Sequence, residues 1–160
     1  LDPGLQADRL WGRRLHWAQR LGLPLLPALL ASAQDPLAVA QRLQLPHGQQ
    51  RLIRCALDLQ ERLQALNDGV SPASSDWPPS RWTRFLEDHH GSPEAVSLAI
   101  AAGATPRRAL LRWLLRWRDQ VAPNSAQELM AQGHRPGPEL GRLLCQQRLV
   151  AIDRSEGVVG

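Results

Sequence analysis

Residues 49–66 read QQRLIRCALDLQERLQAL and carry the clearest helical pattern in the chain. Their apolar residues recur at spacings of three and four positions and therefore share one narrow arc of a helix. These residues are Leu52, Ala56, Leu59, Leu63 and Leu66. Elsewhere Leu, Ala, Gln and Arg are abundant while Val, Ile and Thr are scarce, which favours helix over strand. No segment alternates apolar and polar residues over the length of a strand. The sequence therefore predicts an all-α fold.

Helix start and stop signals predict a series of short helices around this one. Asp35-Pro36 and Ser92-Pro93 place a capping side chain before a Pro at the first helical position. A short turn is expected between Pro24 and Pro27. The other expected helices cover about 6–21, 35–43, 80–89, 92–103, 105–121, 125–133 and 138–150. No repeat of fixed period is present, which disfavours a solenoid.

One stretch has the composition of a linker. Residues 67–79 read NDGVSPASSDWPP, which holds three Pro, a Gly and several Ser and has no helical period. We therefore expect two packed helical subdomains. The predicted division is a body subdomain over 1–67, a linker over 68–79, a tail subdomain over 80–152 and a loose C-terminus over 153–160.

Composition limits the partners and the class of protein. The 160-residue chain has a net charge of +4 and all its basic residues are Arg, a mild bias toward anionic partners. No apolar stretch is long enough to span a membrane, and the first residues lack the features of a secretory signal. Cys55 and Cys145 have no metal or redox spacing, so we expect reduced thiols and a cytoplasmic location. Because the sequence begins with Leu1 and not Met, we expect it to be part of a longer protein.

Residues 107–118 read RRALLRWLLRWR and predict a strongly amphipathic helix. Arg108, Arg112 and Arg116 form one ridge, with Arg107 and Arg118 nearby. Three interpretations stay open for this ridge: a solvated outer face of a core helix, a contact surface for nucleic-acid phosphates, and a membrane-surface helix. The opposite arc is apolar and consists of Ala109, Leu110, Trp113, Leu114 and Trp117.

The turn at residues 133–138, GHRPGP, joins two predicted helices. Free backbone amides at the following helix start could hold a phosphate, with Arg135 supplying charge. Pro138 lacks an N–H, and Glu139 in the first helical turn competes with an anion. The alternative is a purely structural turn that uses Gly137 because its backbone conformation needs glycine.

No motif points to catalysis or metal binding. His89 and His90 follow Glu87 and Asp88, but adjacent residues on a helix point in different directions and do not chelate together easily. The sequence contains no glycine-rich phosphate loop, nucleophile elbow or paired-carboxylate motif. We therefore expect no catalytic centre and no metal site within this chain.

Residues 125–144, SAQELMAQGHRPGPELGRLL, resemble the C-terminal tail of bacterial class II tRNA nucleotidyltransferases and poly(A) polymerases, the CCA-adding enzyme family. Residues 81–86 (RWTRFL) and 43–51 (LQLPHGQQR) are similar to that family's tail and body helix entries. The chain departs from the family at Ala126 and Gln127, where a Gly and a basic residue are common. The positions that match in the tail are Leu129, Gly133, Pro136, Gly137, Pro138, Gly141 and Leu144.

The resemblance implies the RNA-gripping body and tail of a nucleotidyltransferase, with tRNA or another structured RNA as the partner. The family's nucleotide-selecting motif is missing, because Glu87-Asp88 is followed by Gly91 where Arg stands in the family. The Mg²⁺ and the CTP or ATP of the family belong to a catalytic head that this sequence lacks. The residues expected to contact the RNA backbone are Arg107, Arg108, Arg112, Arg116, Arg118, Arg135, Gly137 and Arg142.

A second hypothesis is a helical protein-interaction or dimerisation module without nucleic-acid binding. Exposed Trp side chains at positions 11, 77 or 82 would favour it, because Trp anchors protein interfaces.

Overall fold

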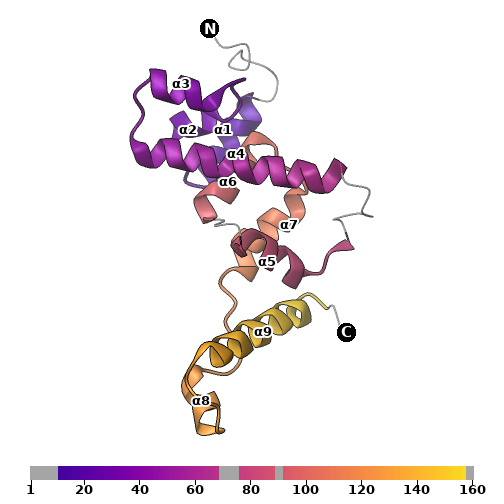
Figure 1. Cartoon of the computed structure of the whole chain (residues 1–160). Coiled ribbons are helices and arrows are strands. Elements are labelled where there is room, and N and C mark those ends of the chain that lie inside the picture. Colours follow the sequence, from indigo (N-terminus) through magenta and orange to yellow (C-terminus); the bar gives the residue numbers. More distant parts are fainter. Residues whose placement is uncertain (1–10, 69–75, 89–91, 158–160) are drawn as a thin grey trace.

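The computed structural model describes residues 11–68, 76–88 and 92–157, and within these ranges all regular structure is helical (Figure 1). The all-α prediction is therefore confirmed. The first half contains α1 (Trp11–Arg20), α2 (Leu25–Leu30), α3 (Pro36–Arg42) and α4 (His47–Asp68). The second half contains α5 (Pro79–Asp88), α6 (Pro93–Ala102), α7 (Arg107–Arg112), the π-helical turn η3 (Trp113–Trp117), α8 (Ala126–Ala131) and α9 (Pro138–Ser155).

Side-chain caps begin three of these helices, as the sequence predicts. The Asp35 carboxylate accepts a hydrogen bond from the backbone N–H of Ala38 at 3.0 Å, and the Ser92 hydroxyl accepts one from Ala95 at 3.1 Å. Before α8, Ser125 and Glu128 form the predicted reciprocal capping box. The backbone N–H and the hydroxyl of Ser125 both lower the pKa of Glu128 below its usual 4.5, because they stabilise its charged form. Local residue chemistry thus sets where these helices start.

Two apolar clusters form the core. The first is built by α1, α2 and α3 against α4 and α6, with Ile53 and Leu98 fully buried. The second lies farther along the chain, where α5, α7, η3 and α9 pack around Leu63 of α4 and Ile100 of α6. Because α4 and α6 contribute to both clusters, the packing is continuous across the predicted 68–79 division. Residues 69–75 of that linker lie outside the described ranges.

The helices follow one another down an elongated molecule (Figure 1). The cluster of α1–α4 occupies one end, α5 and α7 lie in the middle, and the α8–α9 pair forms the other end. The C-terminal part of α9 lies close to α5, and its N-terminal part turns back into α8. The middle of the molecule is therefore where the second core cluster and α9 meet.

Two internal boundaries differ from the prediction. The residues between Pro24 and Pro27 begin α2 instead of forming a turn, because Pro is tolerated in the first turn of a helix. The helix expected to reach Val121 ends as a π-helical turn at Trp117. The expected start of the first helix, residues 6–10, lies outside the described ranges.

The largest difference is at the C-terminus. The last helix was expected to stop near Val150, with residues 153–160 loose, but α9 continues to Ser155. Ile152 is fully buried, and the Asp153 carboxylate accepts a hydrogen bond from the backbone N–H of Ser80 at 2.8 Å. The prediction of a loose tail is therefore wrong for residues 153–157, while 158–160 lie outside the description.

Candidate nucleic-acid interface

Helix α7 and the turn η3 place four of the predicted Arg residues together on one outer face. Arg107, Arg108, Arg112 and Arg116 line one shallow groove together with Leu111 and Leu115. We call these six residues the basic strip. The opposite face packs into the second core cluster as expected, with Leu110, Trp113, Leu114 and Trp117 all buried. The amphipathic pattern predicted for residues 107–118 is therefore confirmed up to Trp117.

The π-helical turn is held by a bond that an α-helix does not make. The backbone N–H of Arg118 donates to the carbonyl oxygen of Trp113 at 3.1 Å, five residues back. Short π-helical segments often occur at functional sites. Trp113 and Trp117, four positions apart, both face the core, while the side chain of Arg116 is 73% exposed.

The carboxylate of Glu156 contacts two Arg of the basic strip from the side of the protein interior. Glu156, just after α9, lies 3.1 Å from Nη1 of Arg112 and 3.6 Å from Nη1 of Arg116. The indole N–H of Trp117 also donates to Glu156, at 3.2 Å. The Glu156 side chain is only 11% exposed, so it supports the two guanidinium groups from below and offsets part of their charge. The strip nevertheless keeps a net positive charge, since it contains four Arg and no acidic residue, and Glu156 pairs with two of the four.

The other members of the strip differ in their surroundings. The guanidinium carbon of Arg107 lies 5.5 Å from the ring centre of Trp17 in α1, a cation–π contact. Its Nε atom is buried and has no hydrogen-bond partner among the described residues. Arg108 is exposed. The strip thus runs from a residue anchored on α1 to one anchored on α9.

Arg118 does not join the strip. It follows η3, pairs with Asp119 at 3.5 Å and does not line the groove of the other four. The π-helical turn ends the helix here, so the helical spacing that predicted Arg118 beside the ridge no longer applies.

The remaining predicted residues lie elsewhere. Arg135 and Gly137 stand in the turn between α8 and α9, which we call the α8–α9 turn, and Arg142 lies early in α9; all three are exposed. An 18-residue helix separates this turn from Glu156, a length of about 27 Å at 1.5 Å per residue. Gly137 has φ 154° and ψ −174°, a backbone region that other residues rarely adopt. The predicted residues therefore form two separate groups, one in the basic strip and one at the α8–α9 turn.

Arg148 is a central residue that the sequence analysis missed. Its guanidinium group donates to both carboxylate oxygens of Glu87, at 2.7 and 2.8 Å, and to the carbonyl oxygens of Gln120 at 2.7 Å and Arg118 at 3.0 Å. The Glu87 carboxylate raises the pKa of Arg148 above its usual value. Arg148 thus ties α5, the end of η3 and α9 together. The sequence did contain a signal for this role. Arg148 lies four residues before the buried Ile152 and so on the same helix face, and a charge on an apolar helix face needs a partner.

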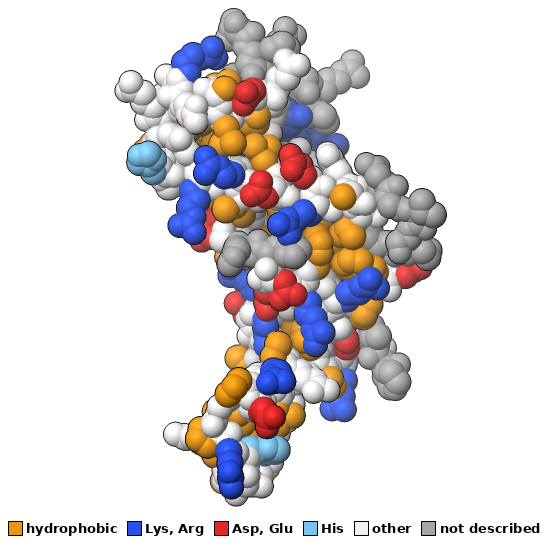
Figure 2. Space-filling model, in the orientation of Figure 1, with side chains coloured by type: hydrophobic (Ala, Val, Ile, Leu, Met, Phe, Trp, Pro, Cys, Tyr) orange, Lys and Arg blue, Asp and Glu red, His pale blue; other side chains and the backbone are white. Residues whose placement is uncertain are grey.

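Charges elsewhere are mixed. On the face drawn in Figure 2, acidic and basic side chains are intermingled, with no broad field of one sign.

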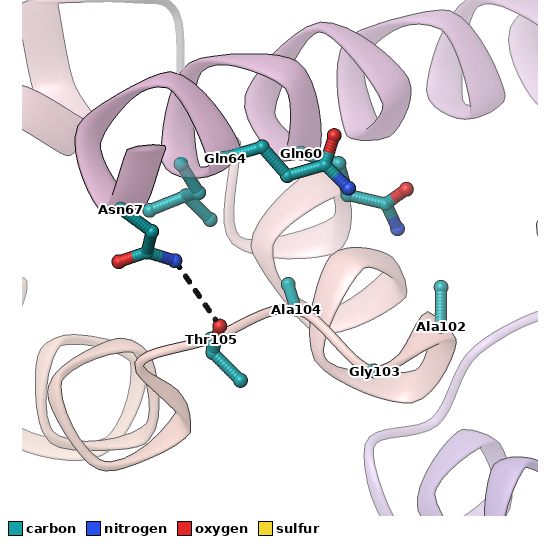
Figure 3. A pocket seen from close by; sticks show the side chains of 8 residues that line it. Gln60, Gln64, Asn67, Ala102, Gly103, Ala104 and Thr105 are labelled. Atoms are coloured by element: carbon teal, nitrogen blue, oxygen red, sulfur yellow. Dashed lines mark hydrogen bonds between the residues drawn. The ribbon is translucent and has the colours of Figure 1, made fainter. Parts of the chain in front are cut away.

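A small polar hollow of about 120 Å³ lies where α4 meets the turn before α7 (Figure 3). Asn67 donates across it to Thr105 at 3.3 Å, beside Gln60 and Gln64. None of the described residues lining this hollow is ionisable, so it offers no acid–base chemistry.

The described ranges contain no candidate metal site and no candidate membrane span. No three His, Cys, Asp or Glu side chains gather there to hold a metal ion. His89 and His90 lie outside the described residues. Among the helices that the structure describes, none has the length and hydropathy to cross a bilayer.

Comparison of the chain with protein-family models, with curated proteins and with solved structures found no match. The resemblance of residues 125–144 to the CCA-adding enzymes therefore stays a prediction.

Proposed function

We propose that this chain is an RNA-binding helical module that holds the sugar-phosphate backbone on the basic strip. The observation that carries the proposal is the gathering of four Arg in one groove, two of which pair with the largely buried carboxylate of Glu156. The planar guanidinium fork suits phosphate oxygens, and A-form RNA is recognised mainly through its shape and backbone.

The resemblance at the α8–α9 turn supports a more specific proposal. We propose that the chain is the body and tail of a tRNA nucleotidyltransferase and that tRNA is the bound RNA. Nucleotide transfer would then be performed by a catalytic head outside this sequence. The described residues offer no carboxylate cluster for the Mg²⁺ of such a head. We therefore assign no reaction step to this chain.

Binding of unfractionated tRNA in a mobility-shift assay at several salt concentrations tests the proposal. Neutralising four phosphates predicts a slope of about −3 to −4 in a plot of log affinity against log salt. Absence of binding at low salt, or binding that salt does not weaken, would reject it.

A matched pair of variants locates the surface. Arg108→Gln with Arg116→Gln should weaken tRNA binding about tenfold and reduce the salt slope by about 2. Arg51→Gln with Arg54→Gln removes the same charge from exposed positions on α4 and should have a much smaller effect. Equal effects of the two pairs would mean that overall charge, and not the basic strip, governs binding.

The second candidate is a protein-interaction or dimerisation module. A groove of about 680 Å³ runs along α9, where Leu143, Val150 and Ala151 face Pro123. The Trp residues favour this candidate less than the sequence suggested, since Trp82 is only 2% exposed and Trp11 and Trp77 are partly buried. Sedimentation of the protein without RNA separates the candidates, because only the second predicts a tight dimer.

A further inference from the structure

We propose that a hollow beside the basic strip binds an unpaired nucleobase, so that the RNA on the strip is single-stranded at this point. This inference rests on the proposed function and specifies the ligand of the same surface. The hollow measures about 710 Å³ and opens between the segment that begins α5 and the segment formed by α7 and η3.

The two sides of the hollow form an apolar slot. Trp77, Pro78 and Trp82 line one side. Trp77 is partly exposed, and its ring centre lies 5.0 Å from that of Trp82 and 4.0 Å from the guanidinium carbon of Arg81. Pro106, Ala109 and Trp117 also line the hollow. Because Trp82 and Trp117 are only 2% and 3% exposed, the accessible apolar surface comes mainly from Trp77, Pro78, Pro106 and Ala109. Flat apolar walls of this kind suit the faces of a planar aromatic ring, and proteins that bind single strands place bases against aromatic side chains.

The slot and the basic strip share two residues. Arg108 and Arg112 line both the groove of the strip and the rim of the hollow. An RNA backbone lying on the strip therefore passes the mouth of the hollow. A base paired in a duplex stays inside its own helix, whereas an unpaired base is free to turn into the slot.

The charges at the rim favour a base over a second phosphate. Asp76 and Glu156 line the hollow together with Arg108 and Arg112. The Asp76 residue is exposed, whereas the Glu156 side chain is 11% exposed and already binds Arg112, Arg116 and Trp117. Carboxylates repel a phosphate group, but they accept hydrogen bonds from the amino groups of bases, while guanidinium groups donate to ring nitrogens and carbonyl oxygens. The mixed rim thus matches the mixed donors and acceptors of a base edge.

The direct test compares two ligands of equal charge. One is a single-stranded oligoadenylate, and the other is a strand of the same length with an abasic residue at every position. The protein should bind the oligoadenylate about tenfold more tightly, the gain expected for stacking one base. Equal affinity for both strands would overturn the inference and leave a phosphate-binding strip. Binding of neither strand or tRNA would overturn the proposed function as well.

A variant that fills the slot provides the second test. Ala109→Leu adds three carbon atoms at the apolar wall without altering any Arg, and Leu is a good helix former. It should abolish the preference for the oligoadenylate while keeping the affinity for the abasic strand. Ala151→Leu makes the same change in the groove along α9 and should keep the preference. Thermal melting by circular dichroism checks that both variants fold.

Two outcomes would contradict the inference. If the folded Ala109→Leu variant keeps the full preference, the base lies elsewhere and the inference is wrong. A proline-rich peptide is the other ligand that walls of Trp and Pro accept. The inference is equally wrong if such a peptide occupies the slot and quenches tryptophan fluorescence while oligoadenylate does not.

Discussion

The basic strip and the α8–α9 turn both contain Arg that the sequence assigned to RNA binding, but they are built differently. The strip rests on a buried helix face, and Glu156 holds two of its Arg from beneath. In the turn, Arg135 and nearby Arg142 are exposed. Contacts with Trp17 and Glu156 thus restrain Arg107, Arg112 and Arg116, and restraining side chains in advance lowers the entropic cost of binding a ligand.

The largest expected effect concerns the support of the strip. Arg148→Met removes the pair with Glu87 and the hydrogen bonds to the carbonyl oxygens after η3. It should lower the free energy of unfolding by about 2–4 kcal/mol, because a carboxylate and several carbonyl groups lose their partner. Chemical unfolding followed by far-UV circular dichroism measures this.

Arg154→Met is the matched control for that change. Arg154 is exposed in the last turn of α9, and its loss should cost no more than about 0.5 kcal/mol. If both variants lose the same stability, Arg148 does not hold the strip in place.

The second effect compares the two regions directly. Arg135→Gln with Arg142→Gln should weaken tRNA binding by about threefold, against about tenfold for Arg108→Gln with Arg116→Gln, because Arg108 and Arg116 share one groove with two further Arg. Mobility shifts at one salt concentration measure both pairs. A greater loss from the turn would reverse the ranking and make the α8–α9 turn the main contact.

The third effect tests whether the turn itself is fixed. Gly137→Val should destabilise the protein by about 1–3 kcal/mol, because φ 154° is strained for a residue with a side chain. Gly141→Ala, inside α9 with open space around it, should instead stabilise by about 0.5–1 kcal/mol. Thermal melting compares the two, and an unchanged melting temperature for Gly137→Val would show that the turn tolerates any residue.

The smallest effect concerns the carboxylate under the strip. Glu156→Gln should tighten tRNA binding about threefold, since Arg112 and Arg116 lose the anion that offsets their charge. Glu139→Gln changes the net charge equally at the start of α9, where no contact with the strip exists among the described residues. Weaker binding by Glu156→Gln would show that the carboxylate serves only to position the two Arg.

Local signals in the sequence predicted the starts of several helices and the inner face of α7 and η3. Asp35, Ser92 and Ser125 act through residues three positions away, so their caps can be recognised from spacing alone. The extension of α9 to Ser155 could not be recognised in this way. It depends on Asp153 meeting Ser80, 73 residues earlier in the chain, and on Glu156 meeting η3.

The same limit applies to the candidate site. The helical spacing placed Arg107, Arg108, Arg112 and Arg116 on one face, and the structure does so too. The helical spacing wrongly placed Arg118 beside these residues, because no local pattern in the sequence indicates a π-helical turn. Arg135, Gly137 and Arg142 were also expected to contact RNA, and the length of α9 separates them from the basic strip. Tertiary contacts decide which elements a long helix packs against, and the spacing of apolar residues within the helix does not reveal them.

The single helix α9 joins the two Arg groups, with Glu156 at one end and Gly137 at the other. A rod of this kind sets a minimum size for any ligand that is to engage both groups simultaneously. Under the proposed function, a short oligonucleotide would reach one end only, whereas a folded RNA would bridge both and gain from the two contacts being tethered. The proposal therefore predicts that affinity depends on the reach of the ligand as well as on its charge.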